Sequence, residues 1–216
     1  NCAAPGITSG DVVVQYRAQS NISPRKGTIA FWVKPAWTVP DAAGNYLFSL
    51  YDAAFAQHAL AAYVTRTNGM TFTVRNAAGI SASASSTNWR GDTWTQIACT
   101  WDFDAGAAVL YANGKTLAQM KTAGAPRTDA YWLCLAAGVV KNSWLTLKGY
   151  VDEVRIYDRA LKADEIGSLY AAYTAASVST AKPSGKGGVP MRAGMNAVPA
   201  SADAVKVVFE ERTGVE

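Results

Sequence analysis

Few side chains in this sequence of 216 residues could do acid–base chemistry. Asp152 and Glu153 are adjacent carboxylates, whereas retaining glycoside hydrolysis needs two carboxyl groups about 5 Å apart that reach the same bond. Neighbouring residues of a strand point to opposite faces, and the next acid is Asp158. The only histidine, His58, has no Gly-x-Ser-x-Gly motif to serve, and phosphate-loop, dinucleotide and zinc motifs are absent. The sequence therefore predicts no catalytic residues and no enzyme.

Aromatic side chains are the stronger candidates for binding, because a Trp or Tyr ring offers a ligand a large apolar face and a polar handle. Trp32 lies opposite an apolar face of alternating residues, which makes it the first choice, with a role in packing as the alternative. The other tryptophans to consider as sugar-binding residues are Trp37, Trp89 and Trp144.

The segment from Tyr150 to Tyr157 brings charged residues onto one face of a strand. Strict alternation places Val151 on the outer face together with Glu153, Arg155 and Tyr157, and places Asp152, Val154 and Ile156 on the inner face. The outer charges can pair with a neighbouring strand, for example with Lys34. Either they form a ladder that fixes strand register, or they form a platform for a ligand. The ligand-binding candidates are Trp32, Lys34, Glu153, Arg155 and Tyr157.

Short strands must position these residues, because apolar alternation recurs between Gly, Asn, Asp and Pro. Asn68-Gly69 and Asn113-Gly114 are typical of tight hairpin turns. No long helical pattern separates the strands, so the chain is predicted to be an all-β antiparallel two-sheet sandwich. The predicted strands are 11–17, 28–34, 46–51, 59–65, 70–75, 94–101, 107–112, 132–136, 145–147 and 150–157.

One short helix and a tail follow the last of these strands. The helix opens at Leu161 and extends for roughly ten residues, with Leu161, Ile166, Leu169 and Tyr170 facing inward. Residues 177–203 are rich in Ser, Pro, Gly and Ala and are predicted to be a flexible linker. Residues 204–216 contain a terminal strand, which must pair with its own or a neighbouring sheet because a lone strand is not stable.

The composition excludes several classes of partner. Half of the residues are hydrophobic and 17% are charged, as in a globular protein with a core. The net charge of +4 comes from scattered basic residues, which predicts no nucleic-acid binding. No apolar run reaches 18 residues, so no membrane insertion is predicted.

Four motifs occur in the order found in one known family. They are GTIAFWVKP at 27–35, WTQIACTWD at 94–102, LYANGK at 110–115 and GYVDEVRIYDRAL at 149–161. Together they resemble the concanavalin A-like, laminin G-like jelly-roll domains. The resemblance covers roughly residues 10–172 and implies two curved antiparallel sheets. We therefore expect residues 1–176 to form one such domain.

The resemblance also implies a function, although the fold serves many. We expect a non-catalytic extracellular or cell-surface domain for binding or adhesion that recognises a glycan or surface polymer. The alternative is a structural subunit of an extracellular filament, surface layer or virion. In that case residues 177–216 would join it to further copies, or to a parent multidomain protein. Some relatives bind calcium through loop carboxylates, and Asp102 and Asp104 are the candidates here, with turn capping as the alternative.

The three cysteines, Cys2, Cys99 and Cys134, show no metal-binding spacing. Cys99 and Cys134 both fall in predicted strands. A Cys99–Cys134 disulfide, two buried free thiols, and a bond to Cys2 all remain open.

Overall fold

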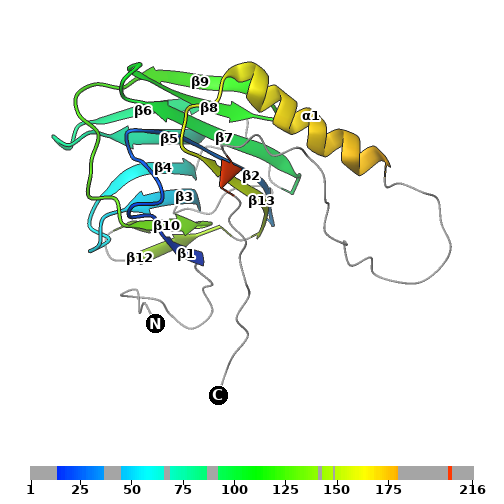
Figure 1. Ribbon diagram of the computed structural model, residues 1–216. Helices are drawn as coiled ribbons and strands as arrows, with labels where there is room; N and C mark the ends of the chain where they lie inside the picture. Colours follow the sequence, from blue (N-terminus) through cyan, green and yellow to red (C-terminus); the bar gives the residue numbers. More distant parts are fainter. Residues whose placement is uncertain are drawn as a thin grey trace.

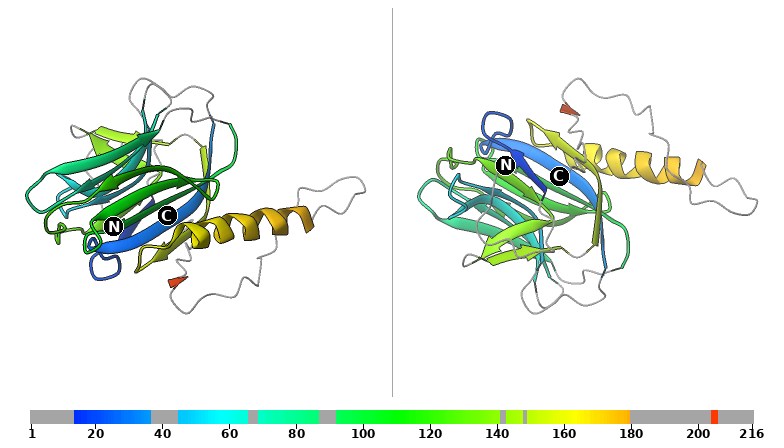
Figure 2. Two further views of the ribbon diagram at one scale, coloured as in Figure 1. Left: turned by 90° about the horizontal axis from the view of Figure 1, so that it is seen from above. Right: turned by 90° about the horizontal axis from the view of Figure 1, so that it is seen from below.

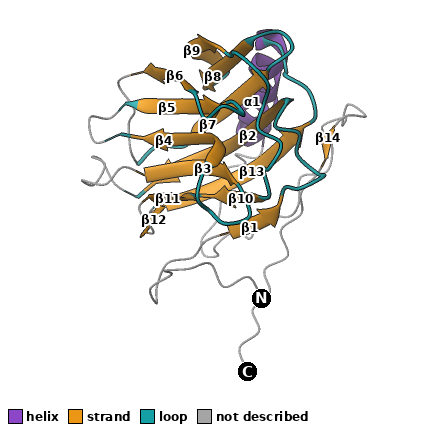
Figure 3. Ribbon diagram, turned by 90° about the vertical axis from the view of Figure 1, so that its left-hand side faces the viewer, coloured by secondary structure: helices purple, strands orange, loops and turns teal. Residues whose placement is uncertain are grey.

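The computed structural model describes residues 14–36, 45–65, 69–86, 92–140, 143–147, 149–179 and 204–205. Two six-stranded antiparallel sheets lie face to face, with one helix outside them (Figure 1). Figure 3 shows the first sheet in front of the second. The predicted jelly-roll sandwich is confirmed.

The strand orders define the two sheets. The first sheet runs β1 (Val14–Arg17), β10 (Trp132–Leu135), β3 (Asn45–Tyr51), β4 (His58–Val64), β5 (Met70–Arg75), β6 (Ser81–Ser86). The second sheet runs β14 (Ala204–Val205), β13 (Gly149–Tyr157), β2 (Lys26–Pro35), β7 (Thr95–Asp102), β8 (Ala107–Ala112), β9 (Lys115–Lys121). A separate hairpin joins β11 (Ala137–Val140) to β12 (Ser143–Thr146).

The inward-facing residues of both sheets form one apolar core. Ile29, Phe31 and Val33 of β2 are buried in it, as their alternation predicts. Phe31 meets Phe48 of β3 edge-on, with ring centroids 6.2 Å apart. Such contacts between rings of opposite sheets fix how the two sheets stack.

All ten predicted strands have a counterpart, although 11–13 of the first lie outside the described residues. The structure adds β6, β9 and β11, which the sequence analysis missed. β6 reads SASASS and β9 reads KTLAQMK, so neither carries a run of alternating large apolar residues. Both are edge strands of their sheets, and an edge strand buries less side-chain surface.

The Asn113-Gly114 hairpin is confirmed, with φ values of 50° and 76° at its two turn residues. β4 and β5 also form the predicted hairpin, although Asn68 lies outside the described residues. Gly114 has a second role, since a Cβ there would lie 2.9 Å from Cβ of Tyr170. The glycine therefore lets the turn approach the helix closely.

The helix α1 (Ala163–Ser179) has 17 residues, longer than predicted, and it continues into the segment expected to be linker. Leu161 and Ile166 are buried, as predicted. The hydroxyl of Thr28 donates to the carbonyl of Arg159 (2.8 Å) and accepts from the amide of Leu161 (2.9 Å). This pair of hydrogen bonds fixes the start of the helix against β2.

In the tail, Ala204 and Val205 form β14, which pairs with Tyr157 and Ile156 of the same chain. The other residues of the predicted linker beyond Ser179, and of the predicted terminal strand beyond Val205, lie outside the described residues.

The structure contains no Cys99–Cys134 disulfide, because both thiols are free and buried. Cys99 points into the core between the sheets. Cys134 of β10 belongs to a different cluster with Tyr51 and Ala137, on the opposite face of the first sheet from Leu133 and Leu135. Strand alternation therefore directs the two thiols apart. Burial raises the pKa of Cys134 to about 12. Cys2 lies outside the described residues.

Candidate functional site

The outer face of the second sheet carries the five residues predicted to bind a ligand. On β2, Thr28, Ala30, Trp32 and Lys34 alternate with the core residues, and their cross-strand partners on β13 share this outer face. Helix α1 runs along the same side of the sheet and extends beyond it (Figure 2). The helix therefore divides the outer face into a covered part and an open part.

A β-bulge in β13 changes the predicted alternation. Asp152 pairs with Trp32, but the register then shifts before Arg155 pairs with Ala30. Val151 and Val154 consequently pack against the core, while Asp152 is exposed and Glu153 turns outward. The expected positions of Val151 and Asp152 were wrong, because strict alternation cannot foresee an extra residue.

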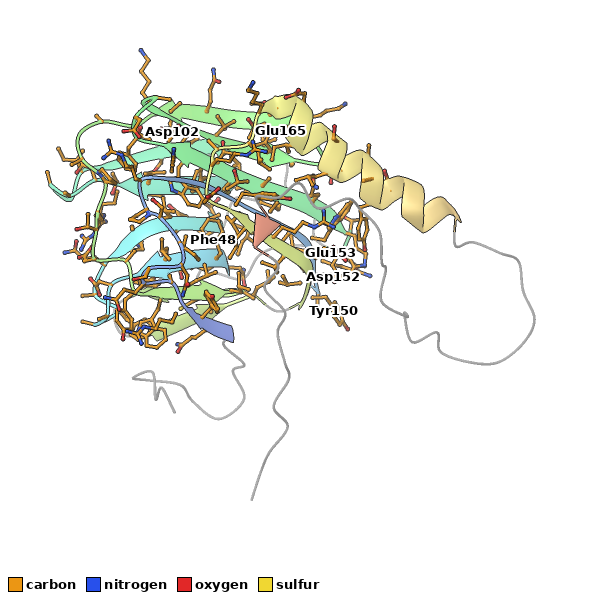
Figure 4. All side chains as sticks on the ribbon, in the orientation of Figure 1. Phe48, Asp102, Tyr150, Asp152, Glu153 and Glu165 are labelled. Carbon is orange, nitrogen blue, oxygen red and sulfur yellow. The ribbon has the colours of Figure 1, made fainter. Side chains whose placement is uncertain are left out.

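The bulge places two carboxylates on the outer face, where Figure 4 shows them near the open end of β13. Glu153 has a φ of 52°, a left-handed conformation that is uncommon for a residue other than Gly. Its amide donates to Oδ1 of Asp152 (2.8 Å), and its carboxylate accepts from Nη2 of Arg155 (2.9 Å). Both carboxylates therefore accept hydrogen bonds from nearby groups of their own strand.

The covered part holds Trp32 and Tyr157, which are only 6% and 5% exposed. Tyr170 and Tyr173 of α1 lie against Trp32, with ring centroids 5.7 Å and 4.3 Å away. Tyr157 packs in one cluster with Leu161 and Ile166. In this structure Trp32 packs against the helix, which occupies the ring face that a ligand would need.

A narrow pocket remains between the helix and the sheet. Its lining includes Trp32, Gln96, Glu153, Arg155 and Tyr173. Gln96 is 4% exposed, and its Oε1 accepts no hydrogen bond from the described residues. A buried amide oxygen without a donor costs about 1–3 kcal/mol, so this oxygen is a suitable position for a bound water or ligand hydroxyl.

The open part contains an aromatic pair that the sequence analysis did not select. Trp94 precedes β7 and is 43% exposed, and Tyr150 on β13 is 63% exposed. Their ring centroids are 6.4 Å apart, with an interplanar angle of 46°. Tyr150 lies directly opposite Lys34, whose Nζ is 3.4 Å from Oδ1 of Asp92. Two accessible rings therefore adjoin one exposed ion pair, and Figure 4 shows Tyr150 projecting from the sheet.

The sequence did contain a signal for this pair. Lys34 was predicted to lie on the outer face, and both aromatic residues stand at strand ends beside it. The ring positions depended on strand pairing, which the sequence did not reveal. Of the other tryptophan candidates, Trp37 and Trp89 lie outside the described residues, and only the backbone of Trp144 is described.

The calcium candidates are engaged in other contacts. Oδ1 of Asp102 accepts from the amides of Asp104 (2.8 Å) and Ala105 (2.9 Å), which caps the turn. Both carboxylate oxygens of Asp104 accept from Arg25. Three of the four oxygens are thus taken, and this pair as it stands does not fit a calcium ion. Within the described ranges, no group of three or more His, Cys, Asp or Glu residues could hold a metal ion.

The histidine packs against an aromatic ring in the first sheet. His58 begins β4 in the first sheet and meets the ring of Tyr51 edge-on at 5.9 Å. Burial, followed by the charges of Arg75 and Arg127, lowers its pKa to about 4. The imidazole is therefore neutral near pH 7.

No helix in the part of the chain that the structure covers has both the length and the apolar character needed to span a bilayer.

Several solved structures share the fold at low sequence identity. A heptameric SAP-like pentraxin from Limulus polyphemus superposes with a TM-score of 0.56 and 16% identity over 77% of this chain and 79% of that chain. The Ruminococcus gnavus IT-sialidase CBM40 bound to α2,3 sialyllactose gives 0.57 and 19% over 68% and 82%. The binding domain of botulinum neurotoxin DC in complex with SialylT gives 0.55 and 13% over 74% and 38%.

Comparison with curated protein sequences gives no match. A family model described as the concanavalin A-like lectin/glucanases superfamily matches residues 8–167, which is most of the chain. The matched residues include the four motifs, the first part of α1 and every strand of the two sheets other than β14. The chain therefore belongs to the concanavalin A-like lectin/glucanase superfamily.

Proposed function

We propose that this chain is a non-catalytic domain that binds carbohydrate outside the cell or at its surface, through Trp94, Tyr150, Lys34 and Asp92. One observation supports this most strongly: two exposed aromatic rings lie 6.4 Å apart beside an exposed ion pair. The apolar face of a sugar ring can cover the aromatic rings, while its hydroxyls exchange hydrogen bonds with the ammonium and the carboxylate. Lys34 and Tyr150 lie on strands, Trp94 directly precedes β7, and the amide of Asp92 donates to the carbonyl of Pro35 (3.0 Å). The sheet thus holds these side chains in place, so binding requires little ordering.

The solved relatives agree with a binding role. The Ruminococcus gnavus domain carries sialyllactose, and the neurotoxin domain is a binding domain in complex with SialylT. At such low identity these relatives support the fold, and the choice of sugar must come from experiment. The engaged state of Asp152 and Glu153 favours binding over bond cleavage.

A glycan array followed by calorimetric titration of the best ligand tests the proposal. Trp94→Ala and Tyr150→Ala should each weaken binding at least tenfold, or about 1.4 kcal/mol, since each removes a ring from the centre of the contact. Leu117→Ala is the matched control, because Leu117 is also exposed (37%) but lies on β9, at the far edge of the sheet from β13. Equal binding by all three variants, or no glycan bound by the native chain, contradicts the proposal.

The edge of β13 supports a second candidate, a subunit of an extracellular assembly. On the side of β13 away from β2, β14 pairs only with Ile156 and Tyr157, and the described residues provide no strand partner on that side for 149–155. A strand from another copy could add there. Light scattering of the full chain distinguishes the two functions: a 22.8 kDa particle fits a binding module, and a polymer fits an assembly.

A further inference from the structure

Two arginines converge at one corner of the first sheet, away from the aromatic surface of the second. Arg75 is the last residue of β5, and Arg127 lies in the segment between β9 and β10. Nη1 of Arg127 donates to Oε1 of Gln57 (2.5 Å), and Nη1 of Arg75 lies 3.4 Å from the same oxygen. Two cations thus point at one neutral amide oxygen, an arrangement in which their mutual repulsion is only weakly offset.

The nearby carboxylates pair with the charge of Arg127, and none of those described pairs with Arg75. Arg127 pairs with Asp129 and lies 3.9 Å from Asp52. The Asp52 carboxylate already accepts three backbone N–H groups of its own loop, at 3.1, 2.9 and 3.0 Å. Arg75 contacts the hydroxyl of Ser81 (3.1 Å), and no carboxylate among the described residues lies within 4.0 Å of its guanidinium. Among the described residues, the charge of Arg75 therefore has no carboxylate partner.

Neutral side chains lie on the strands beside Arg75. His58 follows Gln57 directly, and the positive potential of Arg75 and Arg127 helps to keep its imidazole uncharged. The hydroxyl of Ser83, hydrogen-bonded to Thr73 at 2.9 Å, lies on β6 next to β5, two residues beyond Ser81. An incoming anion would meet guanidinium and hydroxyl donors on a face where the acids are already engaged.

We infer that Arg75 and Arg127 form a binding site for a carboxylate or sulfate group, whose oxygens replace Oε1 of Gln57 as the shared acceptor. The planar forks of two guanidinium groups suit the paired oxygens of such anions better than a single amide oxygen does. The anion can be a free ion or the acidic group of a sugar. This site lies on the opposite sheet from Trp94 and Tyr150, so it stands independently of the function proposed above.

His58 offers a direct reporter, because it is the only histidine in the sequence. Its imidazole signals in an NMR spectrum of the full chain can be followed during titration with sodium sulfate, with sodium chloride holding the ionic strength constant. Sulfate bound between the two arginines should offset their charge and raise the pKa of His58 by roughly 0.5 or more in a saturable manner. At about pH 4.5, where a rise in the pKa of His58 changes its protonation, sodium glucuronate and glucose distinguish an acidic sugar from a neutral one.

Arg75→Gln should weaken the saturable response at least tenfold, and Arg75→Lys, which keeps the charge but loses the fork, should weaken it less. Arg25→Gln is the matched control, because Arg25 is an exposed arginine directly before β2 of the second sheet and pairs with Asp104. Saturation by sulfate or glucuronate, lost in Arg75→Gln and kept in Arg25→Gln and Trp94→Ala, supports the site. A response that never saturates, that persists in Arg75→Gln, or that glucose produces equally overturns it.

Discussion

The pH dependence of stability between pH 7 and pH 5 should come mainly from His58. Its folded pKa is about 4, whereas an unfolded chain gives about 6.5. The native state therefore resists protonation, and stability that is complete above pH 6.5 is lost as the pH falls toward 4. The two pKa values correspond to about 3 kcal/mol at full protonation, of which roughly 2 kcal/mol is lost between pH 7 and pH 5.

Urea unfolding at pH 7 and pH 5 measures this loss directly. His58→Phe keeps a ring against Tyr51 but cannot bind a proton, so its free energy of unfolding should change by less than about 0.5 kcal/mol over the same interval. Glu165, whose pKa is lowered to about 2, contributes only at lower pH. An equal loss in the native chain and in His58→Phe would refute the reasoning, because it would assign the effect to other groups.

Three further predictions concern stability. Glu165→Gln removes the carboxylate that binds Arg159 (2.7 Å) and should lower the free energy of unfolding by about 1 kcal/mol above pH 4.5. Urea unfolding should show this difference disappearing toward pH 2. Gln96→Leu removes a buried oxygen without a donor and should raise the melting temperature, or leave it unchanged; a fall of several degrees would show that a bound group satisfies this oxygen. Gly27→Ala places a Cβ 2.5 Å from the Trp101 ring in the core and should cost about 1–3 kcal/mol in thermal unfolding, whereas a neutral result would mean that the ring shifts freely.

On the outer face of the second sheet, residue alternation predicted which side chains point outward but not which of them remain exposed. Period-two alternation correctly separated the core residues of β2 from Trp32 and Lys34. It could not show that Tyr170 and Tyr173 would cover Trp32, because their contact joins a helix to a distant strand. The bulge at Glu153 likewise depends on how β13 pairs with β2, and it reversed the expected positions of Val151 and Asp152.

By itself, the sequence determined the strands with alternating apolar residues, the Asn113-Gly114 turn, the family motifs and the absence of known catalytic motifs, because each is written in neighbouring residues. Only the tertiary structure decided which outward-facing residues remain accessible. Trp94 and Tyr150 come from separate strands and meet because both strands flank β2, and Arg75 and Arg127 meet because a loop folds over the end of the first sheet. Burial and pairing of this kind depend on residues far apart in the chain, and local periodicity carries no information about them.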